Sequence, residues 1–311
     1  MVGLFRKKDG DDWYVFSQFE PTEARRAFPC FDEPAYKVPW QLTIHAPKGN
    51  SVVSNTPIVS EADGEDGFRD VRFAETKPLP SYLVALGVGP FDFVDAGKAC
   101  KNKVSLRIVT MRGKSSRAQY ASEATAPLLN LLEEYFGIPY PYEKLDLMSV
   151  PQGALFGAME NAGLITFVEQ YILATPQEDT PSFKRNYAWI ATHEMSHMWV
   201  GDLVTMAWWD DTWLNESFAT WMEDKILQRW KPEWQRDVAH VERRNSSADQ
   251  DVLVSARRIR QPIESKDDIT NAFDDISYGK GSAILTMFES WIGEKKFQGR
   301  KVKKINRAAK G

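Results

Sequence analysis

The pentapeptide HEMSH limits this chain more than any other feature, because it places two of only four histidines, His193 and His197, four residues apart. On an α-helix, residues four apart differ by about 40° in direction and one turn in height. Both imidazoles therefore leave one face and can reach one cation, while Glu194, offset by about 100°, can stand beside it as a base. Two ordinary core histidines with local partners are the alternative on these five residues.

Glu216, nineteen residues after His197 in WLNESFATW, is the candidate third ligand. The segment between them contains glycine and is long enough for the next helix to turn back. Two imidazoles and a carboxylate suit zinc, whose catalytic sites take three protein ligands and a water. We therefore expect one Zn²⁺ held by His193, His197 and Glu216. Glu223, on the same helical face as Glu216, either orients a ligand histidine or is a solvated glutamate.

The hydrophobic period changes along the chain and predicts an α+β protein. Up to about Val109, short apolar runs broken by Gly, Pro and Asp indicate strands of an antiparallel sheet. The polar link MRGKSSR marks a domain boundary. We expect a partial N-terminal β-sheet domain over residues 1–112 and a mainly helical catalytic domain over residues 113–311.

Helices stand out in the second part. One ends at Gly137, and the helix carrying HEMSH runs from a cap at Thr180 to Gly201. The next opens at Asp210 or Asp211 and ends before Pro232, and a later one opens at Asp274 or Asp275 and ends at Gly293. The basic residues after that position predict a solvated or frayed terminus rather than a nucleic-acid patch.

Composition excludes some function classes. A net charge of -4 gives no general attraction to nucleic acid or to anionic membranes. No apolar run approaches the roughly eighteen residues that span a bilayer, so we expect no membrane segment. The N-terminus lacks the apolar region of a secretory signal, which favours a cytoplasmic protein, although an incomplete N-terminus would hide such a signal.

Five motifs in a fixed order resemble the aminopeptidase N family of zinc aminopeptidases, which are gluzincins. HEMSH is followed after eighteen residues by Glu216 in WLNES. GAMEN lies upstream at residues 157–161, SYGKG with Tyr278 lies downstream, and QFEPTEARRAFPCFDEP begins at Gln18. The resemblance runs from about Asp12 to about Phe297. It implies an antiparallel β-sheet domain followed by a thermolysin-like catalytic domain, apparently truncated at both ends and lacking its C-terminal helices.

The resemblance also implies how such an enzyme hydrolyses a peptide bond. Zinc activates a water and polarises the scissile carbonyl. Glu194 would act as the general base and pass the proton to the leaving amine. Tyr278 would donate a hydrogen bond to the developing oxyanion.

Substrate recognition follows from the same family pattern. Glu160 and Glu20 would hold the charged α-amino group of a peptide with a free N-terminus. Gly157 and Ala158 would offer backbone groups along the substrate, as a strand edge does. A further pair, Gln18 and Phe156, are candidates for the pocket that receives the first side chain, although apolar packing explains Phe156 equally well.

Three other functions stay open at this point. A thermolysin-type endopeptidase could share HExxH and the downstream glutamate but has no need of GAMEN. Epoxide hydrolysis, as in the leukotriene-hydrolase branch, is compatible with the motifs, and an inactive peptide-binding scaffold is compatible with truncation. Ser217 replaces a glycine common in the family, and we expect little harm from it. Missing helices would expose apolar faces and favour association.

Overall fold

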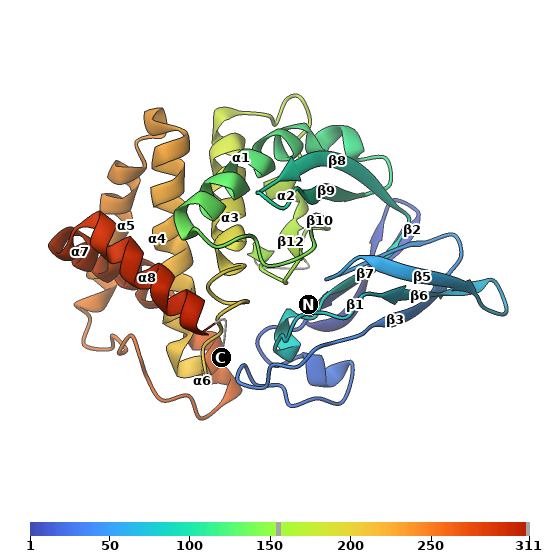
Figure 1. The fold of residues 1–311 in the computed structure, drawn as a ribbon, viewed down its shortest axis with the longest axis horizontal. Helices are drawn as coiled ribbons and strands as arrows, with labels where there is room; N and C mark the ends of the chain where they lie inside the picture. The colour runs from blue at the N-terminus through green and yellow to red at the C-terminus, as the bar shows by residue number, and fades with distance from the viewer. Residues whose placement is uncertain (154–156, 309–311) are drawn as a thin grey trace.

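A computed structural model describes residues 1–153 and 157–308 of the chain (Figure 1). The β-rich N-terminal half lies on the right of the view and the helices lie on the left. This arrangement confirms the expected fold class of an antiparallel β-sheet domain followed by a mainly helical domain. The helices are α1 (Gln119–Phe136), α2 (Glu169–Ile172), α3 (Pro181–His197), α4 (Thr212–Trp230), α5 (Arg236–Asp251), α6 (Lys266–Asn271), α7 (Gly281–Ile292) and α8 (Glu294–Ala308).

Two antiparallel sheets make up most of the N-terminal half. The first has the order β1-β2-β7-β4 and the second the order β3-β6-β5. A Cβ on Gly89 would lie 2.3 Å from the ring of Tyr14, so only glycine lets the two strands that carry them pack this closely. The strands are β1 (Gly3–Asp9), β2 (Asp12–Gln18), β3 (Thr43–Pro47), β4 (Ser51–Ser54), β5 (Ile58–Asp63), β6 (Phe68–Phe73) and β7 (Leu86–Gly89).

A five-stranded sheet of order β11-β12-β10-β9-β8 supports the helices. Its strands β9, β10 and β12 are parallel, and α1 packs against β8 and β9. The boundary expected near residue 112 falls between β9 and α1, and this sheet takes strands from both sides of it. That boundary stays a prediction. The strands are β8 (Phe91–Ala99), β9 (Val104–Met111), β10 (Lys144–Val150), β11 (Ala158–Met159) and β12 (Leu164–Val168).

The buried carboxylate of Asp146 binds two basic side chains in the middle of this sheet. Asp146 accepts hydrogen bonds from Arg107 Nε and Nη2 at 2.8 and 2.7 Å, and Lys144 Nζ lies 3.0 Å from its Oδ2. Burial alone would raise the pKa of Asp146, but Lys144 and Arg107 hold that pKa below its ordinary value. The carboxylate therefore stabilises the fold above the usual aspartate pKa, and this contribution is lost as the pH falls below it.

Asp146→Asn should lower the free energy of unfolding by about 3–5 kcal/mol, because it leaves the buried Lys144 charge uncompensated. Urea unfolding measures the loss. Asp63→Asn is the matched control: its side chain is 81% exposed beside Lys48, so the change should cost less than about 1 kcal/mol. Equal losses in the two variants would contradict a special role for Asp146.

The helices predicted from periodicity are present, and one of them, α3, ends earlier than predicted. Gly137 ends α1 in the left-handed conformation, and Thr180 Oγ1 caps α3 by accepting from the Phe183 N–H at 3.2 Å. The end predicted for α3 at Gly201 is wrong, because the helix stops at His197. The chain then turns so that Asp202 N donates to His197 O at 3.0 Å.

The C-terminal helix α8 contradicts the prediction of a solvated or frayed terminus. Phe297 and Ile305 are buried in the helical core, and the ring of Phe297 lies 5.5 Å from that of Trp221. These two positions are eight residues apart and so share one helical face. These two apolar side chains hold α8 on the core, although most of its other residues are polar or basic.

Large apolar side chains stay exposed on α5 and α7. Two of them, Val241 and Met287, line a cleft of about 1100 Å³ between α4, α5 and α7. Association through this surface stays a prediction. The most exposed of these side chains are Val238, Val241, Met287, Phe288 and Trp291.

Across residues 1–153 and 157–308, none of the helices is both long enough and apolar enough to cross a bilayer.

Candidate metal centre

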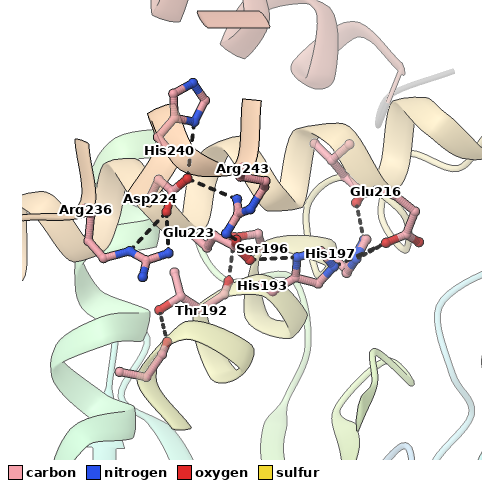
Figure 2. A network of polar contacts seen from close by, with 12 residues as sticks. Thr192, His193, Ser196, His197, Glu216, Glu223, Asp224, Arg236, His240 and Arg243 are labelled. Atoms are coloured by element: carbon pink, nitrogen blue, oxygen red, sulfur yellow. Dashed lines mark hydrogen bonds and ion pairs between the residues drawn. The ribbon is translucent and has the colours of Figure 1, made fainter. Parts of the chain in front are cut away.

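The three predicted ligands meet between α3 and α4, which pack against each other. His193 Nε2 lies 3.2 Å from Glu216 Oε2, and His197 Nε2 lies 3.7 Å from the same oxygen. Figure 2 shows the two histidines and Glu216 close together. One ligand atom from each residue lies within 4.8 Å of the others. The α-helical spacing of the two histidines and the return of the chain in α4 produce this convergence.

The other ring nitrogen of each histidine is already engaged. His193 Nδ1 donates to Glu223 Oε2 at 3.0 Å, and His197 Nδ1 donates to the carbonyl oxygen of Val200 at 3.1 Å. A proton on Nδ1 leaves Nε2 as a free lone pair, which is the form that binds a metal. Both Nε2 atoms face Glu216, and each would give up its proton to bind a metal. The donor set and its orientation therefore fit zinc.

The imidazoles and carboxylates of the centre lie close enough to shift one another's pKa values. Burial acts against the protonated form of the two imidazoles, but Glu216 and Glu223 raise the pKa of His193 well above its ordinary value. Glu160 and Glu216 raise the pKa of His197 to about 9. Burial would raise the pKa of Glu216, yet the two histidines hold it far below its ordinary value. Each partner thus stabilises the charged form of the other, as a bound cation would stabilise the carboxylate.

A second group of potential ligands borders the first. Glu160, Glu194 and His197 each offer one atom within 4.8 Å of the others, and all three are buried. Burial, followed by the neighbouring carboxylate of Glu160, raises the pKa of Glu194 to about 8, although His193 opposes the shift. The predicted base and the predicted amine anchor are therefore neighbours of one predicted metal ligand, His197.

The GAMEN residues lie at an edge of the five-stranded sheet. Ala158 and Met159 form β11, which pairs only with β12 among the described strands. Gly157 O accepts from the Val168 N–H at 2.8 Å, and Glu160 follows directly after the strand. The other edge of β11 has no strand beside it in the described part of the chain.

The N-terminal half contributes Glu20 and Gln18. Burial raises the pKa of Glu20 well above its ordinary value, and Glu160, Glu216 and Glu194 add to the shift. Gln18 ends β2, and its buried Oε1 has no hydrogen-bond partner among the described residues. Phe156, the other predicted pocket residue, lies outside the described residues. Glu20, from the N-terminal half, thus lies close enough to the carboxylates of the metal centre to interact with them.

Tyr278 lies in η6 (Ile276–Lys280), a short π-helical segment of the kind often found at functional sites. Its ring centroid lies 6.0 Å from that of His193, at an angle of 23°. Burial raises the pKa of Tyr278 well above its ordinary value, and nearby Glu216 adds to the shift. The phenol therefore keeps its proton and can donate a hydrogen bond.

The glycines of SYGKG are required by close helix packing. A Cβ on Gly279 would lie 1.9 Å from Ser247 Oγ, and one on Gly281 would lie 1.7 Å from Ser217 Oγ. The Ser217 hydroxyl donates to the carbonyl oxygen of Ser277 at 2.6 Å. The serine that departs from the family pattern thus adds a bond between α4 and the tyrosine segment.

Two residues near the centre were not predicted. Asp202 is fully buried, and its carboxylate oxygens have no hydrogen-bond partner in the described part of the chain. Lys37 Nζ donates to the backbone oxygens of Asp202 and Leu203 at 2.7 and 3.1 Å, which joins the N-terminal half to the turn after α3. A lysine in a loop and an aspartate after a helix carry no pattern that would predict this contact.

Comparison with known families gives two matches in the order of the structure. Residues 1–83 match the peptidase M1 N-terminal domain, and residues 120–305 match the peptidase family M1 domain. The second match reaches into α8. Both agree with the resemblance drawn from the five motifs, and that prediction is confirmed.

Relatives from plants and archaea carry aminopeptidase names. The chain is 39% identical over 282 residues to aminopeptidase M1-D of Oryza sativa subsp. japonica, covering 91% of this chain and 32% of that protein. It is 37% identical over 302 residues to a leucyl aminopeptidase of Saccharolobus solfataricus, covering 96% and 37%. Probable aminopeptidase 1 of Sulfurisphaera tokodaii is 38% identical over 309 residues, covering 99% and 38%. The chain thus spans about a third of the length of these relatives.

Proposed function

Since the chain belongs to peptidase family M1, we propose that it is the catalytic part of a zinc aminopeptidase, which removes residues from peptides with a free N-terminus. The convergence of His193 Nε2 and His197 Nε2 on one oxygen of Glu216 supports this proposal most strongly. Glu160 and Glu194, beside the same histidine, add the groups that the reaction needs.

His193, His197 and Glu216 would hold one Zn²⁺, which, when bound, lowers the pKa of a water and polarises the scissile carbonyl. Glu194 would accept the proton of the attacking water and deliver it to the leaving amine. Its buried position keeps competing solvent away from the carboxylate. Glu223 would hold the His193 ring in the tautomer that presents Nε2.

Glu160 and Glu20 would select the free N-terminus. In a peptide, the α-amino nitrogen and the first carbonyl carbon are separated by two bonds, about 2.5 Å. Because a Glu160 oxygen lies within 4.8 Å of ligand atoms of Glu194 and His197, an amine held there brings the first carbonyl to the metal centre. An internal peptide bond has no charged amine to offer, so these carboxylates would be left buried without a cation.

The remaining contacts would align the substrate. Tyr278 would donate to the oxyanion as it forms, since its phenol stays protonated. The free edge of β11 at Gly157 and Ala158 would pair with the extended peptide backbone. Gln18, whose buried Oε1 needs a donor, would line the pocket for the first residue. The endopeptidase alternative gives no reason for the carboxylates of Glu160 and Glu20.

The zinc-loaded chain should cleave a fluorogenic aminoacyl amide and leave its N-acetylated form intact, because acetylation removes the charge that Glu160 holds. Glu160→Ala should lower kcat/KM for the free amine about 10–100-fold, mainly through KM, since a hydrogen bond to a charged group contributes about 1.5–3 kcal/mol. Steady-state fluorescence assays on both substrates measure these effects.

Glu123→Ala is the matched control, because Glu123 is exposed on α1 and should leave both constants unchanged. Equal cleavage of the two substrates would indicate an endopeptidase instead. A zinc-bound chain that cleaves neither substrate would overturn the proposal in favour of a peptide-binding scaffold. An unchanged KM in Glu160→Ala would refute the anchor role alone.

A further inference from the structure

A cationic face of α5 contacts two carboxylates of α4, Asp224 and Glu223, next to the metal centre. Arg236, His240 and Arg243 recur at intervals of four and three residues, so they lie on one side of the helix. All three contact Asp224 on α4: Arg236 Nη2 lies 2.6 Å from Oδ1, and His240 Nδ1 and Arg243 Nη1 lie 3.3 and 3.0 Å from Oδ2 (Figure 2). Periodicity missed α5 because Ser247 is its only buried residue.

Arg243 also reaches the residue next to Asp224. Its Nη2 forms an ion pair with Glu223 Oε1 at 2.9 Å, while the other oxygen of Glu223 accepts from His193 Nδ1 at 3.0 Å. The Glu223 side chain is only 2% exposed. The guanidinium carbon lies 5.4 Å from the ring centroid of Trp189, on α3, which holds the arginine from a second side. A continuous chain of contacts therefore runs from α5 to His193.

The two carboxylates depend on Arg243 to different degrees. Asp224 keeps Arg236 and His240 if Arg243 is removed. Glu223 Oε1, in contrast, accepts no hydrogen bond within residues 1–153 and 157–308, and its ion pair with Arg243 is the one charged contact that it makes there. Losing the guanidinium would therefore leave this buried oxygen without a counter-charge, which favours rotation of Glu223 away from His193. The packing between α4 and α5 would keep its other ion pairs.

We propose that Arg243 is a positioning residue for the metal centre: it fixes the Glu223 carboxylate, which in turn holds His193 with Nε2 toward Glu216. The proposal rests on the proposed zinc site. Partners that orient ligand histidines typically contribute 10–100-fold to metal affinity. Arg243 acts one contact further away, so the lower part of this range applies.

The test measures zinc affinity by competition with a chromophoric chelator. Arg243→Met should weaken zinc binding about 10-fold, and Arg243→Lys should recover part of it, because an ammonium restores the charge but not both contacts. Arg244→Met is the matched control on the same helix, since Arg244 is exposed and should bind zinc like the unchanged chain. The visible spectrum of the cobalt-substituted protein should change for Arg243→Met, change less for Arg243→Lys and stay the same for Arg244→Met, a pattern that a purely structural role would not cause.

A double-mutant cycle separates this relay from a general loss of stability. In a Glu223→Gln background, Arg243→Met should weaken zinc binding no further, whereas additive losses would overturn the proposal. Unchanged affinity and spectrum in Arg243→Met would also overturn it. Should Arg243→Met fail to fold, Arg243→Lys decides: full affinity with an unchanged cobalt spectrum refutes the positioning role. Failure of the unchanged chain to bind zinc would refute the metal centre itself, which is a different result.

Discussion

Glu194→Gln should bind zinc as tightly as the unchanged chain and lose about 10²–10⁴-fold in kcat, the usual contribution of a positioned general base. The amide has the size of the carboxylate but cannot take a proton from water. Glu194 belongs to the group with Glu160 and His197, but not to the group of His193, His197 and Glu216 that faces one carboxylate oxygen. Metal content and turnover should therefore separate in this variant.

The measurement pairs zinc titration with turnover of the free aminoacyl amide. Glu123→Gln controls for a neutralised glutamate far from the centre, because Glu123 is exposed on α1. Turnover within a few-fold of the unchanged chain would remove Glu194 as the base. Loss of zinc together with turnover would instead assign the residue to metal binding.

Glu216→Ala should lose both zinc and activity. The substitution removes the oxygen toward which both Nε2 atoms point, at 3.2 and 3.7 Å, and leaves two imidazoles as the only donors of that group. Residues that merely orient a ligand contribute 10–100-fold to affinity, so we expect the loss of a ligand to exceed about 100-fold. Equilibrium dialysis with zinc at fixed free concentrations measures the change.

Glu233→Ala controls for the loss of a carboxylate near the end of α4, because its side chain is 63% exposed. Stoichiometric zinc in Glu216→Ala at the affinity of the unchanged chain would refute the assignment of this ligand. Together with Glu194→Gln, the variant distinguishes residues that hold the metal from those that use it: one should lose zinc, and the other should retain it.

Sequence periodicity predicted the helices whose apolar stripe is plain in the sequence and missed α5 and α8, whose sequences are mostly polar. The ends of α1 and α4 follow from a glycine and a proline, whose backbone preferences are local. Only Ser247 is buried in α5, so no stripe marks this helix. The basic composition of α8 hides Phe297 and Ile305, which secure it to the core through contacts distant in sequence.

The candidate site divides in the same way. Residues tied to one another by helical spacing, such as His193 and His197, could be predicted because local geometry brings them together. The proximity of Glu20 to Glu160 depends on how the N-terminal half packs on the catalytic part, and only the family resemblance indicated it. Neither the contact of Arg243 with Glu223 nor that of Lys37 with Asp202 leaves a local signal, since each joins separate segments.

The contact between Ser217 and Gly281 links two positions that perform no chemistry. Residue 217 follows the predicted third ligand, and residue 281 lies three residues after the tyrosine. Their contact therefore sets the distance between α4 and the segment that carries Tyr278. The Ser217 hydroxyl already fills the space that a side chain on Gly281 would need. Any side chain at position 281 would collide with Ser217, so a larger residue there requires a smaller one at position 217 if the tyrosine segment is to stay on α4.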